Sequence, residues 1–124
     1  MCKTLVFGAS LKPFRYSNIV VKRLIDHEIE TQAYGPKTGK IGKVQVLDSF
    51  DDFQDIHTIT LYLGPSHQPQ YYQDIIRLKP KRVIFNPGAE NPEFYGLLEE
   101  QGIEAMEACT LVLLATDQYK TRVR

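Results

Sequence analysis

The stretch that most constrains the fold is residues 4–17, where a short apolar segment runs into a turn of small residues and then into a helical pattern. Its first four residues, Thr4–Phe7, carry no charge, which is typical of a strand buried on both faces. The strand breaks at Gly8, and the turn continues through Ala9 and Ser10. Strand, glycine turn and helix form the phosphate-binding corner of nucleotide-binding α/β folds, because the turn N–H groups and the positive helix end attract anions.

The glycine pattern of this corner differs from the usual dinucleotide fingerprint. That fingerprint needs three glycines in the order G-x-G-x-x-G, and only Gly8 fits it. We therefore expect a phosphate corner of another kind, in which Ser10 and the turn N–H groups hold a pyrophosphate. The alternative is a tight turn that needs small residues for steric reasons alone.

The residues of the turn and the helix start resemble a known family. They follow the pattern G-A-S-x-x-P-x-R-x-S directly after the first strand, with Gly8, Ala9, Ser10, Pro13, Arg15 and Ser17 in the defined places. This resembles the small CoA-binding domain family, single-domain bacterial proteins related to the CoA-binding domain of succinyl-CoA synthetase. The resemblance continues at Pro36, Ile41, Gly42 and Ser49. It implies a Rossmann-like fold and coenzyme A as ligand.

Length and charge indicate a small cytoplasmic domain. The 124 residues predict a single domain, residues 1–124, and leave no room for a second catalytic one. Fifteen basic residues balance fifteen acidic ones, so no net field attracts nucleic acid or an anionic membrane. No apolar run reaches membrane-spanning length, and no signal peptide precedes the first strand. Two cysteines give neither a disulfide framework nor a zinc spacing, so we expect the reducing cytoplasm.

Strand and helix patterns alternate along the rest of the chain. Strands are expected near residues 30–34, 44–46, 58–63, 82–85 and 103–106, and helices beginning at the N-caps Ser17, Ser66 and Asn91, with a short one after Cys109. Residues 36–43, with three lysines and two glycines, predict a mobile, positively charged loop. The pattern predicts a three-layer Rossmann-like α/β fold, with a parallel sheet of about five to six strands and helices on both faces.

Ligands of such sheets lie at the carboxyl ends of the strands, and two basic residues are expected there. Arg15 can pair with a phosphate, although a solvent-facing role is as plausible from the sequence. Lys37 follows the second strand, where an NAD-binding domain needs Asp or Glu. A lysine there suits the phosphorylated ribose of coenzyme A or NADP and does not separate the two. Its alternative is a hydrophilic loop residue.

The family resemblance implies further contacts at the same edge. Pro65 would form a wall for the pantetheine or adenine, and Asn86 and Gly88 would belong to a ligand-facing turn. Cys109 matches a family cysteine. A thiol facing the coenzyme is one interpretation, but the apolar residues 111–114 favour burial. His67 lies at this edge without a carboxylate or nucleophile placed to work with it, so we predict no catalytic residue and no metal site.

Three functions are compatible with these observations. The first is a protein that binds coenzyme A or an acyl-CoA without catalytic activity of its own. The second is a small NADP-binding oxidoreductase or redox sensor, which would need a substrate-holding lobe or a partner chain. The third is a degenerate Rossmann domain that serves as an interaction module. The sequence leaves open a homo-oligomer or an unidentified protein partner.

Overall fold

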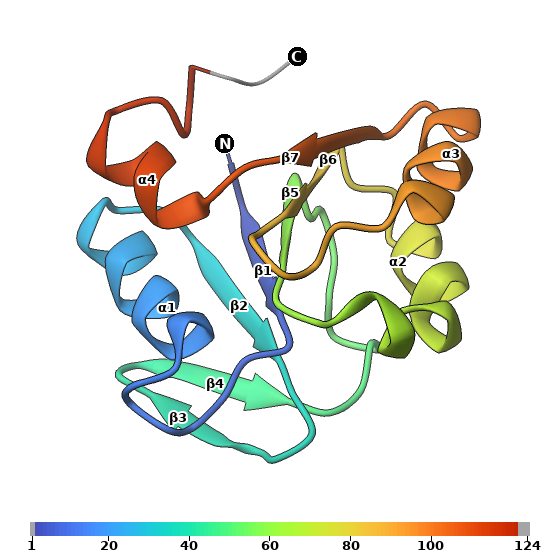
Figure 1. The fold of residues 1–124 in the computed structure, drawn as a ribbon. Helices are drawn as coiled ribbons and strands as arrows, with labels where there is room; N and C mark the ends of the chain where they lie inside the picture. Colours follow the sequence, from blue (N-terminus) through green and yellow to red (C-terminus); the bar gives the residue numbers. More distant parts are fainter. Residues whose placement is uncertain (1, 122–124) are drawn as a thin grey trace.

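A seven-stranded sheet lies between two layers of helices in the computed structural model, which describes residues 2–121 (Figure 1). The strands lie in the order β3-β4-β2-β1-β5-β6-β7, and every neighbouring pair is parallel except β3 and β4. Their bounds are β1 Thr4–Phe7, β2 Thr31–Tyr34, β3 Gly39–Ile41, β4 Val44–Leu47, β5 Thr58–Leu61, β6 Arg82–Phe85 and β7 Glu104–Glu107. This confirms the predicted Rossmann-like α/β class.

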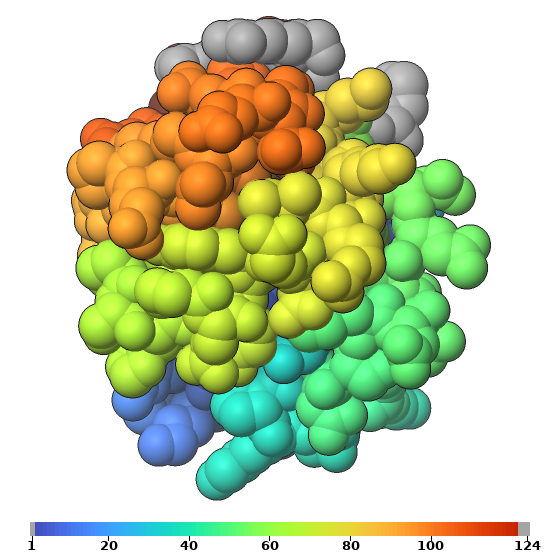
Figure 2. Space-filling model, turned by 90° about the vertical axis from the view of Figure 1, so that its right-hand side faces the viewer, coloured from blue at the N-terminus to red at the C-terminus, as the bar shows by residue number. Residues whose placement is uncertain are grey.

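Two helices cover each face of the sheet. Helices α1 (Tyr16–Asp26) and α4 (Thr110–Ala115) lie on one face, and α2 (Tyr72–Arg77) and α3 (Pro92–Glu100) lie on the other (Figure 1). Figure 2 looks onto the second face, where the segments of α2 and α3 form most of the surface. No helix within residues 2–121 is long and apolar enough to span a membrane.

The central strands are buried on both faces, as the uncharged run of β1 predicted. All four residues of β1, β5 and β6 are buried. Alternate side chains enter different cores, because successive residues of a strand point to opposite faces. Val6 and Ile84 pack under α1 and α4, whereas Leu5, Phe7 and Phe85 pack under α2 and α3. Each such side chain contributes about 1.5–3 kcal/mol by leaving water.

The six parallel strands confirm the predicted number, but the seventh strand, β3, was not predicted, because it lies in the segment expected to be a mobile loop. Gly39–Ile41 pairs antiparallel with β4, and Gly42 makes the hairpin turn with a φ of +59°. The Leu11 side chain lies where a Cβ of Gly39 would be, with its nearest carbon at 2.8 Å. The glycines that suggested flexibility thus permit a tight turn and a close contact.

Two of the three predicted helix starts were wrong. Helix α1 begins at Tyr16 with Arg15 as N-cap, and the Ser17 hydroxyl instead accepts a hydrogen bond from the Ser10 N–H at 3.1 Å. Ser66 begins no α-helix, because it lies in a 3₁₀ turn, Pro65–His67, followed by a second one, Pro69–Tyr71. Pro69 has no N–H and so interrupts the helical bonds until Tyr72.

The predicted bounds of α3 are confirmed. The Asn91 side chain caps this helix by accepting a hydrogen bond from the Phe94 N–H at 3.3 Å, and Pro92 is its first residue. The helix ends at Glu100, and Gly102 follows with a φ of +74°. Here the capping signals in the local sequence coincide with the observed ends of the helix.

Candidate functional site

The loops that follow the parallel strands meet at one edge of the sheet, which we call the carboxyl edge. The strand order reverses at β1, because β2 pairs with it on one side and β5 on the other. Such a reversal is where α/β sheets bind ligands. Residues 8–15 follow β1 at this point, at the bottom of Figure 1, and segments coloured blue, cyan and yellow-green meet along the lower part of Figure 2.

The turn after β1 is fixed by hydrogen bonds to its neighbours. The N–H groups of Gly8 and Ala9 both donate to the Tyr34 carbonyl oxygen at 2.9 Å, which ties the turn to β2. The Ser10 N–H donates to Ser17, and the Asn18 side-chain amide donates to the Ser10 carbonyl at 2.8 Å. The three turn N–H groups expected to hold a pyrophosphate are therefore already bonded within the protein.

The start of α1 supplies donors that these bonds do not use. The N–H groups of Tyr16 and Ser17 take no part in the bonds that fix the turn. They point along the axis of an eleven-residue helix, whose N-terminus carries a partial positive charge. The N–H groups of this corner that the turn does not use thus lie at the start of α1 and not in residues 8–10, where the sequence indicated them.

Gly8 is the residue that lets the turn lie against β5. Its φ is +94°, and a Cβ built on it would lie 2.5 Å from the Tyr62 carbonyl oxygen. Gly35 has the same role after β2, since its Cβ would overlap the carbonyl oxygen of Ala9. A larger residue at either position would separate the ends of neighbouring strands, so both glycines are needed for the shape of the edge.

The predicted basic residues of the edge are exposed. Arg15 lies at the N-cap of α1, and its guanidinium carbon is 5.6 Å from the centroid of the Phe14 ring. Lys37 lies in the exposed segment after β2, and Pro13 is exposed in the turn. The ion pairs among the described residues involve Lys3 and Arg77, so neither Arg15 nor Lys37 takes part in one. Both cations are available to a ligand.

The loops after β5 and β6 present the next two predicted residues. Pro65 is exposed at the start of its 3₁₀ turn. Gly88 is also exposed, with a φ of +96°, and its N–H donates to a carboxylate oxygen of Glu90 at 2.8 Å. An anionic side chain thus already occupies this N–H group.

Asn86 does not face a ligand, which corrects the prediction for this residue. It is buried, and its amide donates to the Thr60 hydroxyl at 2.7 Å and to the Leu61 carbonyl at 3.1 Å. Its side-chain oxygen accepts from the Thr110 N–H at 2.9 Å. Both ends of the side chain are engaged, so Asn86 joins β5 and β6 to the start of α4.

The comparison with known families identifies the chain. The CoA binding domain matches residues 3–115. The chain belongs to this CoA-binding domain family. An uncharacterised protein of known crystal structure is 39% identical, with a TM-score of 0.92 over 96% of this chain and 98% of the other. Similar structures from Pyrococcus horikoshii OT3 and Pyrococcus furiosus are 27% and 26% identical, each over 90% of this chain and over 80% and 98% of theirs, with TM-scores of 0.81 and 0.79. No curated protein matches the chain.

The remaining predicted residue of this CoA-binding domain, Cys109, is only partly buried. It is the N-cap of α4, with an extended backbone, and is not in a disulfide. The favoured burial of the thiol is thus only partial, because the buried apolar residues of α4 begin at Leu113, four positions after Cys109. Tyr62 lies near this thiol, and burial raises the pKa of its phenol above the ordinary value.

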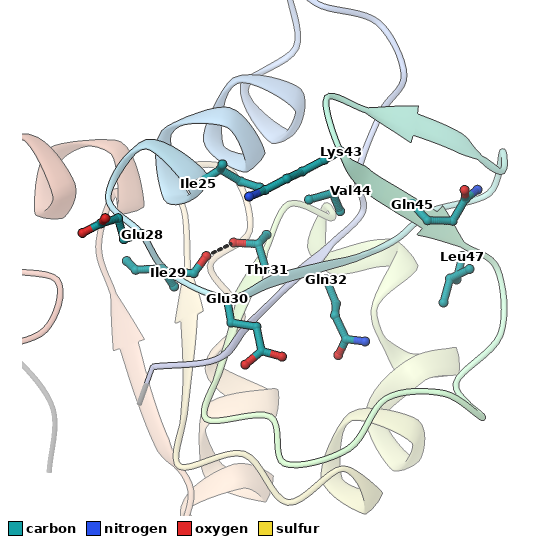
Figure 3. A pocket seen from close by; sticks show the side chains of 10 residues that line it. All are labelled: Ile25, Glu28, Ile29, Glu30, Thr31, Gln32, Lys43, Val44, Gln45 and Leu47. Atoms are coloured by element: carbon teal, nitrogen blue, oxygen red, sulfur yellow. Dashed lines mark hydrogen bonds between the residues drawn. The ribbon is translucent and has the colours of Figure 1, made fainter.

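A large cavity of the CoA-binding domain lies away from the carboxyl edge. It has a volume of about 600 Å³ and opens where β2 and β4 diverge, because these strands pair only at Ala33–Val46 and Tyr34–Leu47. In Figure 3 Glu30 and Gln32 point to one side of the sheet and Lys43 extends on the other. The polar groups do not converge, and none of the predicted site residues lines this cavity.

Sequence reasoning missed two buried polar side chains at the carboxyl edge. Asn18 is 3% exposed, and its side-chain oxygen has no hydrogen-bond partner among the described residues. Gln68 is completely buried between two loops. A glutamine flanked by His67 and Pro69 reads as an exposed loop residue, so no pattern in the chain signals its burial. Residues 2–121 contain no cluster of His, Cys, Asp and Glu that could hold a metal ion.

Proposed function

We propose that this CoA-binding domain holds coenzyme A or an acyl-CoA at the carboxyl edge, without catalytic activity of its own. The observation that carries the proposal is the start of α1, where the Ser10–Ser17 bond fixes the turn and leaves the Tyr16 and Ser17 N–H groups unused. A phosphate at this position would gain both the helix N-terminus and the Arg15 side chain at its N-cap.

The charges of the edge suit a ligand with more than one phosphate. Arg15 would pair with the pyrophosphate by charge-assisted hydrogen bonds. Lys37, which follows β2, would approach a phosphorylated ribose, since no carboxylate stands in the exposed segment from Pro36 to Lys40. Coenzyme A carries both groups, and when bound it supplies a thiol that holds acyl groups as thioesters. Ser10 and Pro13 would shape the turn, while Pro65 and Gly88 would border the ligand on the side of β5 and β6.

One observation favours an interaction module as a second candidate. Phe14 and Tyr16 are 72% and 71% exposed, and both adjoin the turn. Large exposed aromatic residues are enriched at protein interfaces. A partner protein on these residues would cover the same corner that we assign to the ligand, so the two functions would compete for one surface.

Isothermal titration with coenzyme A, acetyl-CoA, NADP and NAD tests the proposal. We expect micromolar affinity for coenzyme A that falls about threefold to tenfold in Arg15→Met and weakens with added salt. The matched control is Arg23→Met in the last turn of the same helix, which should bind as the wild type does. Binding of NADP without coenzyme A would support the redox alternative. Binding of neither would overturn the proposal and favour the interaction module.

A further inference from the structure

We infer that Gln68 is the positioning residue of the coenzyme site, because it fixes the loops after β5 and β6 against each other. This inference rests on the proposed function. Gln68 lies outside the phosphate corner and would not touch the coenzyme phosphates at the start of α1. It would act through the two loops that carry Pro65 and Gly88.

The Gln68 side chain bridges two loops that are far apart in sequence. Its amide donates to the Leu63 carbonyl oxygen at 2.8 Å, at the end of the segment that follows β5. The same amide donates to the Ala89 carbonyl oxygen at 2.7 Å, in the loop that follows β6. Leu63 precedes Gly64 and Ala89 follows Gly88, so this one side chain sets the distance between the backbones of the two loops.

A second set of bonds holds Gln68 in place. Its side-chain oxygen accepts from the Asn91 amide at 2.8 Å, and the same amide donates to the Tyr72 hydroxyl at 2.8 Å. The Tyr72 hydroxyl in turn donates to a Glu93 carboxylate oxygen at 2.9 Å. This chain of bonds connects the loops to α2 and α3. Burial raises the pKa of Tyr72, which keeps its hydroxyl protonated as a donor.

Neither methionine nor ionised glutamate reproduces the bonds of Gln68. Gln68 is 0% exposed, so each polar group that loses its partner there also lacks water. Methionine has a similar shape but would leave both carbonyl oxygens and the Asn91 amide without their bonds. Glutamate keeps the acceptor for Asn91 but, when ionised, directs an oxygen at two carbonyl oxygens. The glutamine amide supplies two N–H donors on one side and an acceptor oxygen on the other, which matches the three bonds made here.

Coenzyme A titration of Gln68→Met tests the inference, with the exposed Gln73→Met on the adjoining helix as matched control. We expect affinity to fall about tenfold in Gln68→Met and to stay unchanged in Gln73→Met. Amide hydrogen exchange of the unliganded protein should accelerate at Gly64 and at residues 88 and 89. Arg82→Ala, which lies at the opposite end of β6, should lower stability without changing the affinity.

Gln68→Glu separates positioning from folding through its pH dependence. Burial and the two carbonyl oxygens should raise the pKa of the introduced carboxyl, and its protonated form can donate to one of them. Affinity relative to the wild type should therefore recover as the pH falls from 8 to 5.5. Unchanged affinity in both variants, or equal loss in Arg82→Ala, would overturn the inference while leaving the proposed function intact. A wild type that binds no coenzyme A would overturn the proposed function itself.

Discussion

The two ends of the parallel sheet both contain buried polar side chains, but these make different kinds of connection. At the amino edge, where the strands begin, Arg82 donates to the Thr58 hydroxyl at 2.8 Å and to the Tyr119 carbonyl at 2.9 Å. Its guanidinium carbon lies 4.5 Å from the centroid of the Tyr119 ring. These bonds join strand starts to the C-terminal segment. At the carboxyl edge, Gln68 and Asn86 instead join loops to one another and to a helix start.

The difference shows that burial alone does not reveal what a polar residue does. Arg82 and Gln68 are both almost fully buried and both make several hydrogen bonds. Arg82 holds regular elements that no proposed ligand touches, whereas Gln68 holds loops that border the proposed site. We therefore expect the first to affect stability alone, and the second to affect stability and ligand affinity together.

The largest expected effect is on stability at the amino edge. Arg82→Ala should lower the free energy of unfolding by about 3–5 kcal/mol, because it opens a cavity and leaves buried acceptors without a donor. Urea denaturation measures this change, and the exposed neighbour Lys81→Ala serves as control with an expected change near zero. A folded Arg82→Ala protein whose coenzyme affinity drops clearly would contradict the separation of the two ends.

A smaller loss of stability is expected when either of two glycines of the carboxyl edge, Gly8 or Gly88, is replaced by alanine. Gly8 and Gly88 have nearly the same φ, +94° and +96°, but only Gly8 has atoms close to where a Cβ would lie. Both alanine substitutions carry a backbone strain of about 1 kcal/mol. Gly8→Ala adds the clash with Tyr62 and should cost about 2–3 kcal/mol in all, with a clear loss of coenzyme affinity.

Thermal unfolding and coenzyme titration of the two glycine variants give the comparison directly. The difference in stability between the two variants measures the cost of the clash between β1 and β5, because both variants carry the same backbone strain. Equal stability of Gly8→Ala and Gly88→Ala would mean that the Tyr62 carbonyl moves away easily, and the shape of the edge would then not depend on Gly8.

The smallest effect is a pH dependence that belongs to the amino edge. Burial, Arg82 and Lys81 lower the pKa of His57 below its usual value of about 6.5. The folded protein therefore disfavours the charged imidazole, so this group leaves stability unchanged above pH 7 and reduces it as the pH falls through its folded pKa. His57→Gln should flatten the stability curve between pH 7 and 5 without altering coenzyme affinity. An unchanged slope would show that other groups control this range.

The strands and one helix could be predicted because local residues decide them. The β-branched run of β5 and the Asn91, Pro92 and Gly102 signals of α3 need no information from distant parts of the chain. The strand β3 was not predicted, because its glycines suggested flexibility, whereas Gly42 forms the hairpin turn and Gly39 leaves room for the Leu11 side chain. A glycine that makes room for a neighbour and a glycine that gives flexibility look the same in sequence.

The details of the candidate site were harder to predict, because they depend on which hydrogen bonds its side chains make with distant parts of the protein. Ser17 was expected to cap α1, but its hydroxyl is used by Ser10 across the turn. Asn86 was expected to face a ligand, but Thr60 and Thr110 engage both ends of its amide. The family pattern indicates which loops form the carboxyl edge, but it does not show which of their side chains are bonded within the protein.

The hydrogen bond between Thr4 and Tyr119 has a consequence for how the chain folds during synthesis. The two hydroxyl oxygens lie 2.6 Å apart although 115 positions separate the residues. At about 5–20 residues per second, Thr4 leaves the peptidyl-transferase centre roughly 6–23 s before Tyr119 is added. Over that interval β1 can pair with β2 and β5, and Arg82 can donate to the Thr58 hydroxyl, but the second acceptor, the Tyr119 carbonyl oxygen, is still missing. The hydrogen bonds of the buried Arg82 are thus completed only after Tyr119 has joined the strands that precede it.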